Sequence, residues 1–274
     1  MASRHSGSGT SFRRHVAPFA PVALALAMNI GERAGIPGGV ARGVQFFEPV
    51  CALPFTGVRN PLIDDHCGID GSSSKPADQA ENRAKNNFCA ATQLPRVITY
   101  DELLDMQTKS GNIPKNLPDR TALQKLGEGE YVSYVAFIKD AHYSDVGAGE
   151  AVNCNIRGNA TNDIHIVLLK DPNDDECLST TAEMSPHYRP PDWTPENLNA
   201  VKDHPVRIQG QLFFDGNHHT PCHGNTRPKP KRASLWELHP VYAVDVCTQT
   251  TIPECQSSTA EWTSLSNFFS SEQQ

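Results

Sequence analysis

The sequence predicts a mainly β protein, with one small closed barrel of five strands between about residues 127 and 247. The first observation is a change of hydrophobic period at Gly127, from helical spacing before it to strand-like alternation after it. The second is a single short helix among the strands, predicted by Thr194 as N-cap and Pro195 in the first turn. The third is eight cysteines without a Cys-x-x-Cys pair, which favour disulfides over a zinc ribbon or a redox motif.

Short capped helices are predicted ahead of the barrel. Residues 78–81 and 99–102 both have the form of a capping box, in which an N-cap side chain and an acid three residues later satisfy free backbone N–H groups. Cysteines on both sides of the first helix predict a small region pinned by disulfides. The polar residues of that helix are interpreted as a solvated face: Asn82, Lys85, Asn86 and Asn87.

Alternation of apolar residues predicts the barrel strands. Residues 180–184 either continue the third strand or pair at its edge, and the short helix lies between the third and fourth strands. The five predicted strands are residues 131–138, a segment near 151–156, 163–169, 206–214 and 234–247.

The N-terminus has the parts of an export signal. Arg13 and Arg14 precede an apolar run that ends in Ala-Leu-Ala. A disordered tail is the alternative. Export would place the protein in the periplasm or outside the cell, where disulfides persist. The predicted regions are residues 1–27 (export signal), 28–50 (linker), 51–126 (helical lead-in), 127–247 (barrel) and 248–274 (C-terminal tail).

The order of three strands, a helix and two strands resembles the OB fold, a five-stranded Greek-key barrel. Residues 183–187, 206–215 and 234–240 also resemble an OB-like domain of uncharacterised, apparently exported bacterial proteins. The resemblance implies a fold and a compartment, and it brings no known activity with it.

Alternation also predicts a polar patch on the outside of the barrel. Asp163 and His165 share one face of the third strand, opposite Ile164 and its apolar neighbours. Glu237 and His239 share the outward face of the last strand, which the OB resemblance makes a neighbour of the third. Imidazole and carboxylate suit general acid–base catalysis or a divalent metal. The alternative is a solvated sheet face with cross-strand pairs.

Two further groups complete the candidate residues. Glu183 is a catalytic candidate and His187 a ligand-binding one, because both lie before the helix where they could overhang the patch. Asp215 is another ligand-binding candidate, which either ends a turn or supports His218. The loop that follows, residues 216–233, matches an OB binding loop. Its candidates for a metal are His218, His219 and His223, and its candidates for a ligand are His218, Arg227, Lys229 and Lys231.

Charge and missing motifs exclude several function classes. The net charge of −7 disfavours general nucleic-acid binding, because an acidic surface repels phosphate backbones. No apolar stretch is long enough for a membrane span. The sequence has no nucleophile elbow, P-loop, dinucleotide fingerprint or His-Glu-x-x-His motif. No cofactor is predicted apart from a divalent metal.

The sequence therefore leaves three hypotheses for function. The leading one is a binding protein for an extracytoplasmic ligand or protein partner, which uses the outer face and the loops of the barrel. The second is a hydrolase, with or without a metal, that acts through the Asp/Glu/His patch. The third is an interaction module whose polar face is only solvated.

Overall fold

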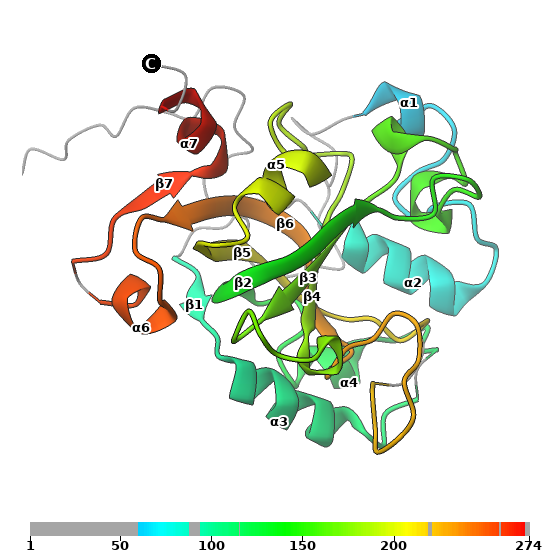
Figure 1. Cartoon of the computed structure of the whole chain (residues 1–274). Coiled ribbons are helices and arrows are strands. Elements are labelled where there is room, and N and C mark those ends of the chain that lie inside the picture. Colours follow the sequence, from blue (N-terminus) through cyan, green and yellow to red (C-terminus); the bar gives the residue numbers. More distant parts are fainter. Residues whose placement is uncertain (1–59, 88–93, 115, 219–220, 258, 272–274) are drawn as a thin grey trace, which may run out of the picture. The chain divides into compact units, whose positions relative to one another are not determined.

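The computed structural model describes residues 60–87, 94–114, 116–218, 221–257 and 259–271 (Figure 1). The helices are α1 (Pro61–Asp64), α2 (Pro76–Lys85), α3 (Tyr100–Ser110), α4 (Thr121–Gln124), α5 (Pro195–Ala200), α6 (Ile252–Cys255) and α7 (Leu265–Ser271). The strands are β1 (Arg96–Val97), β2 (Tyr131–Tyr143), β3 (Ile164–Leu169), β4 (Thr180–Met184), β5 (Pro205–Phe214), β6 (Trp236–Cys247) and β7 (Trp262–Ser264). Short 3₁₀ turns lie at Ala151–Asn153, Asn159–Thr161 and Glu176–Leu178.

Five strands close into a barrel. They are hydrogen-bonded in the order β2-β3-β4-β6-β5, and β5 pairs back with β2. The β4–β6 pairing is parallel and the other four are antiparallel. Helix α5 lies between β4 and β5 in the chain. The predicted fold class, a mainly β protein built on an OB-like five-stranded barrel, is confirmed.

One strand assignment made from the sequence is wrong, and for residues 180–184 the alternative of pairing with the third predicted strand is confirmed. The segment near 151–156 begins as the 3₁₀ turn Ala151–Asn153 instead of a strand. Residues 180–184 form β4, a full member of the barrel, and β4 lies between β3 and β6. The third predicted strand and the last one are therefore separated by β4, and Glu183 lies on that strand instead of in a loop.

The barrel interior is apolar, as alternation predicts. Ile164, Ile166 and Leu168 of β3 face Trp236 and Leu238 of β6 within one buried cluster. Because successive side chains of a strand alternate, the polar residues between them point to the outside of the barrel. Strands β1 and β7 extend the sheet, β1 beside β2 and β7 beside β6.

Helix α2 covers part of the outer barrel face (Figure 1). The Gln211 side chain on β5 donates to the carbonyl oxygens of Ala84 and His239, both at 2.8 Å. The Asn87 side chain, just past the helix, donates to Gln211 Oε1 at 2.6 Å. The interpretation of a solvated helix face is therefore wrong. The polar residues assigned to it are buried against the barrel: Asn82, Lys85, Asn86 and Asn87.

The two capping predictions have different outcomes. Thr99 caps α3, and its capping box with Glu102 is complete. Helix α2 instead begins at Pro76 with Lys75 as N-cap, so the box predicted at residues 78–81 is wrong. A proline in the first turn starts this helix, because its missing N–H has no partner there in any case.

Three disulfides connect the described cysteines. They join Cys67 to Cys154, Cys177 to Cys222, and Cys247 to Cys255. The predicted export signal and linker, together with Cys51 and Cys89, lie outside the described residues. Within the residues that are described, none of the helices has the length and apolar character needed to cross a membrane.

Candidate functional site

Three neighbouring strands bring the predicted polar patch together. Asp163 immediately precedes β3 and His165 lies on it, directly opposite Glu183 of β4. Glu237 lies on β6 opposite Thr181 of β4. His239 follows two residues later, so it points to the same outer face. These five residues are buried, with relative exposures of 8% or less.

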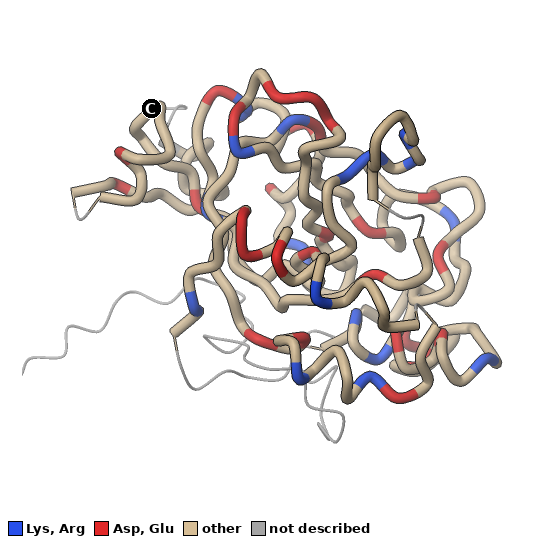
Figure 2. Tube along the Cα trace, turned by 90° about the horizontal axis from the view of Figure 1, so that it is seen from below, with Lys and Arg blue, Asp and Glu red and all other residues tan. Residues whose placement is uncertain are grey.

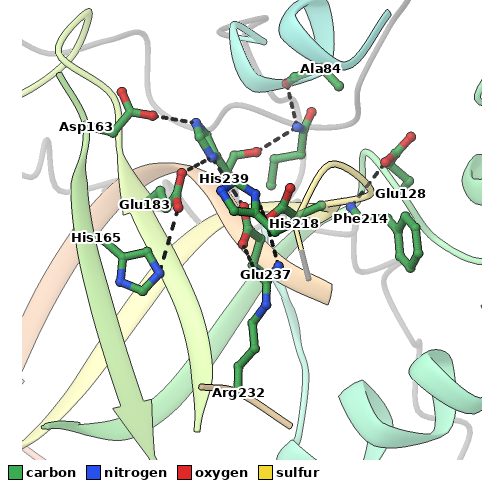
Figure 3. A network of polar contacts seen from close by, with 12 residues as sticks. Ala84, Glu128, Asp163, His165, Glu183, Phe214, His218, Arg232, Glu237 and His239 are labelled. Atoms are coloured by element: carbon green, nitrogen blue, oxygen red, sulfur yellow. Dashed lines mark hydrogen bonds and ion pairs between the residues drawn. The ribbon is translucent and has the colours of Figure 1, made fainter. Parts of the chain in front are cut away.

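His239 lies at the centre of this group (Figure 3). Its Nε2 is 3.3 Å from Asp163 Oδ2, and its Nδ1 is 2.9 Å from Glu183 Oε2 and 3.4 Å from Glu237 Oε1. The His239 and Asp163 side chains are each 1% exposed. Each ring nitrogen therefore has a carboxylate oxygen within ion-pair distance and away from bulk water.

None of these contacts has the direction of a hydrogen bond. His239 Nδ1, Asp163 Oδ2 and Glu237 Oε1 are buried and make no hydrogen bond within the described part of the chain. One ligand atom from each of Asp163, Glu183 and His239 lies within 4.8 Å of the others. Three ligand atoms this close together could bind one cation.

Burial and charge act on these groups in opposite directions. Burial alone lowers the pKa of His239, but the surrounding carboxylates outweigh it and raise that pKa well above its usual value. Burial raises the pKa of Glu183, yet His239 and Lys85 hold it below its usual value. Burial and the neighbouring carboxylates raise the pKa of Glu237. Positive charge at the centre of this group is therefore strongly favoured.

The buried network is rich in acid. Among the described residues, six carboxylates are buried with only three Lys or Arg side chains to balance them. Arg232 donates to Asp215 at 2.9 Å and to Glu237 at 3.1 Å. Arg120 pairs with Glu128 and lies 3.6 Å from Glu81. Lys85 interacts electrostatically with Asp215, Glu183, Glu81 and Glu237. An added cation would reduce the imbalance.

His218 and Asp215 form a pair at the edge of the network. His218 Nδ1 lies 2.6 Å from Asp215 Oδ2, and the His218 side chain is 44% exposed while that of Asp215 is buried. The hydrogen bond to Asp215 raises the pKa of His218. Of the two roles expected for Asp215, support of His218 is the one the structure shows. A carboxylate that orients an exposed imidazole is the usual arrangement of a general acid or base.

A second layer fixes Asp163. The Asn153 side chain donates to Asp163 Oδ1 at 2.9 Å, and Glu150 Oε2 accepts from the backbone N–H of Asp163 at 2.8 Å. Burial, Asp163 and Glu183 raise the pKa of Glu150 to about 8. These contacts hold one carboxylate oxygen of Asp163 in place and leave the other directed at His239.

An open cleft of about 690 Å³ reaches this network. Glu183 and His165 line this cleft, together with Glu150, Asp215, His218 and Arg232. Lys229 and Lys231 also line it, from the loop in which the sequence predicts ligand contacts. The cleft therefore gives a small molecule access to one side of the buried group.

The remaining candidates lie elsewhere or are already paired. His187 Nε2 is 2.7 Å from Asp64 Oδ1, in a contact that joins α1 to the loop after β4. Arg227 pairs with Asp175, and Lys231, which lines the cleft, pairs with Glu176.

The metal site predicted in the 216–233 loop is not assembled in the described residues. His218 is engaged by Asp215, and His223 is exposed on the loop. His219 lies outside the described residues. The group with metal-ligand geometry in the described chain is that of Asp163, Glu183 and His239.

Three members of the site were missed from the sequence. The sequence predicts a solvated Lys85, although it lies one helical turn after Glu81 on the same face of α2. Arg232 lies in the loop just before β6, and the sequence does not distinguish it from the other basic residues of that loop. Glu150 lies just before a predicted strand that does not form.

Comparisons with known proteins give no family. No protein-family model and no curated protein matches the sequence. Among solved structures, the chain has a likeness to a "putative aspartyl-tRNA synthetase from Leishmania major Friedlin", with a TM-score of 0.26 and 12% identity. The match covers 57% of this chain and 21% of that one, so this chain spans about a fifth of that protein's length.

Proposed function

We propose that this protein is a divalent-metal-dependent hydrolase. The observation that carries the proposal is the convergence of Asp163, Glu183 and His239 from three neighbouring strands, with buried oxygen and nitrogen atoms that make no hydrogen bond. Two carboxylates and one imidazole suit Mn²⁺, Fe²⁺ or Zn²⁺ and leave coordination positions for water and substrate. The cleft at Glu183 supplies the approach.

The groups around the cleft fit hydrolytic chemistry. A bound divalent cation lowers the pKa of a coordinated water and stabilises negative charge on the substrate. His218, oriented by Asp215, lies beside the cleft and is the group we assign to proton transfer with the leaving group. Arg232 donates to the same oxygen, Asp215 Oδ2, at 2.9 Å and helps to hold it in place.

The test begins with metal content. Purified protein is stripped with a chelator, reloaded with Mn²⁺, Zn²⁺ or Mg²⁺, and assayed against nitrophenyl esters, phosphomonoesters and phosphodiesters. We expect activity with at least one ion, and at least a 100-fold loss of activity in Asp163→Asn and His239→Gln together with loss of the bound ion. Asp175→Asn, at an exposed ion pair, is the matched control that should bind and act as the wild type does.

A different result would refute the hydrolase. Metal-free protein with unchanged activity, or Asp163→Asn with unchanged metal affinity, would show that the three side chains hold no functional ion. Protein that binds the ion tightly but cleaves none of these substrates would favour the second candidate.

The second candidate is a binding protein that uses the same cleft. Its support is the open cleft, which Lys229 and Lys231 help to line. The three disulfides are typical of an oxidising compartment and support export to the periplasm or beyond. Figure 2 shows Lys and Arg interspersed with Asp and Glu along the described trace, which gives no support to a nucleic-acid ligand.

The third hypothesis, a polar face that is only solvated, has lost its support. The side chains of Asp163, Glu237 and His239 are buried and form one network. Burying charge in this way is costly unless the group is balanced by partners or by an ion.

A further inference from the structure

The carboxylate of Glu183 faces two different histidines. Its Oε2 is 2.9 Å from His239 Nδ1, and its Oε1 is 3.9 Å from His165 Nε2. Figure 3 shows the two rings on different sides of the carboxylate. The proposed metal site uses the side of the Glu183 carboxylate that faces His239. The oxygen that faces His165, Oε1, has no role in that site.

His165 is an unusual histidine for a purely structural position. The residue is 8% exposed, and its Nδ1 is buried without a hydrogen-bond partner in the described residues. Its Nε2 is too far from Glu183 Oε1 for a hydrogen bond. Two ligands on one cation at about 2.1 Å are roughly 3 Å apart when adjacent and roughly 4 Å apart when opposite. The distance between Nε2 and Oε1 falls in this range.

His165 also lies at the wall of the cleft. Glu183 and His165 line the cleft, whereas Asp163 and His239 do not. An ion held by Glu183 Oε1 and His165 would therefore lie between the inner metal and the incoming substrate. With only two protein ligands, it would keep several positions for water or substrate.

We propose that Glu183 bridges two divalent cations, an inner one with Asp163 and His239 and an outer one with His165 on the cleft side. The proposal rests on the proposed function for the inner ion and adds a site to it. A bridging carboxylate holds two metals about 3.5–4 Å apart, the spacing with which paired ions act on the attacking and leaving oxygens of one substrate. The outer ion binds more weakly because it has fewer protein ligands.

The test uses Mn²⁺ alone as the probe on the full chain. Titration calorimetry and equilibrium dialysis give the number of ions bound, and electron paramagnetic resonance reports whether two bound ions are coupled. We expect two ions in the wild type, with a coupled spectrum. His165→Ala and the closer replacement His165→Gln should each bind one ion, with an uncoupled spectrum and a urea midpoint that shows the protein is folded. His66→Ala, which removes an exposed histidine, should bind two.

The outcomes separate the outer site from the inner one. One ion in the wild type, lost in His239→Gln, would refute the outer site and leave the proposed function intact. Two ions in both His165 variants would refute the role of His165. No bound ion in the wild type would refute both the outer site and the proposed function.

Discussion

Arg232 balances two buried carboxylates beside the cleft. It is itself buried and donates to both Asp215 and Glu237. Replacing it with methionine would leave both carboxylates buried without their partner. We expect Arg232→Met to lower the free energy of unfolding by about 3–5 kcal/mol.

Urea denaturation measures this loss, and Arg227 supplies the control. Arg227 pairs with Asp175 on the surface, where both side chains are more than half exposed. Arg227→Met should therefore cost less than about 1 kcal/mol. Equal losses in the two variants would contradict the account of Arg232.

Glu81 should make stability depend on pH. Burial raises its pKa from 4.5 to about 7, against the opposing effects of Lys85 and Arg120. Because the folded-state pKa lies above the unfolded one, the stability from the neutral carboxyl is complete below about pH 4.5 and is lost as the pH rises through 7. Glu81→Gln keeps the neutral shape at every pH. As the pH rises from 4 to 8, the free energy of unfolding of the variant should increase relative to that of the wild type by on the order of 3 kcal/mol.

Chelator-treated protein unfolded in urea at several pH values gives this comparison. Parallel curves for the wild type and Glu81→Gln would mean that Glu81 titrates normally. If the free energy of unfolding of Glu81→Gln increased relative to that of the wild type as the pH falls, the result would contradict the effect of burial.

At the scale of elements, the junction between α2 and the barrel depends on Gln211. Its side chain links Ala84, Asn87 and the backbone of His239. Gln211→Leu would leave these buried groups without partners, at about 1–3 kcal/mol each. In the Gln211→Leu variant, we expect amide exchange to become faster than in the wild type, and more so in α2 than in α3. Hydrogen exchange with mass spectrometry measures this change. Unchanged protection of α2 would show that other contacts hold the helix.

The strands also show which features of the fold could be predicted from the sequence. Alternation predicted which faces of β3 and β6 are polar, because inward and outward positions follow from strand geometry alone. It did not predict that β4 lies between them, since pairing is set by the whole barrel. The 151–156 segment alternates too, but the Ala151–Asn153 turn forms there.

The prediction of a solvated face on helix α2 is wrong for a related reason. A helix that carries Glu81, Asn82 and Lys85 has the composition of a solvated surface, yet the outer barrel face beneath it is also polar. Local hydrophobicity carries no information about such polar contacts. Lys85 was therefore found only once the fold had placed it among the carboxylates.

At the scale of the whole molecule, the three disulfides close loops of very different length. Their sequence separations are 87 residues for Cys67–Cys154, 45 for Cys177–Cys222 and 8 for Cys247–Cys255. Loop-closure entropy predicts that loss of each bond costs about 4.6, 4.0 and 2.6 kcal/mol in that order. Double serine variants compared by urea midpoint should follow this ranking. A larger loss from the shortest loop would contradict it.

The proposed function depends on a divalent cation bound between Asp163, Glu183 and His239. The most direct measurement is X-ray diffraction from crystals grown with Mn²⁺, with an anomalous map calculated at the manganese edge. We predict an anomalous peak bounded by the carboxylates of Asp163 and Glu183 and by one ring nitrogen of His239. A map with no peak there, and with His239 still held by ion pairs to its three carboxylates, would contradict the central claim.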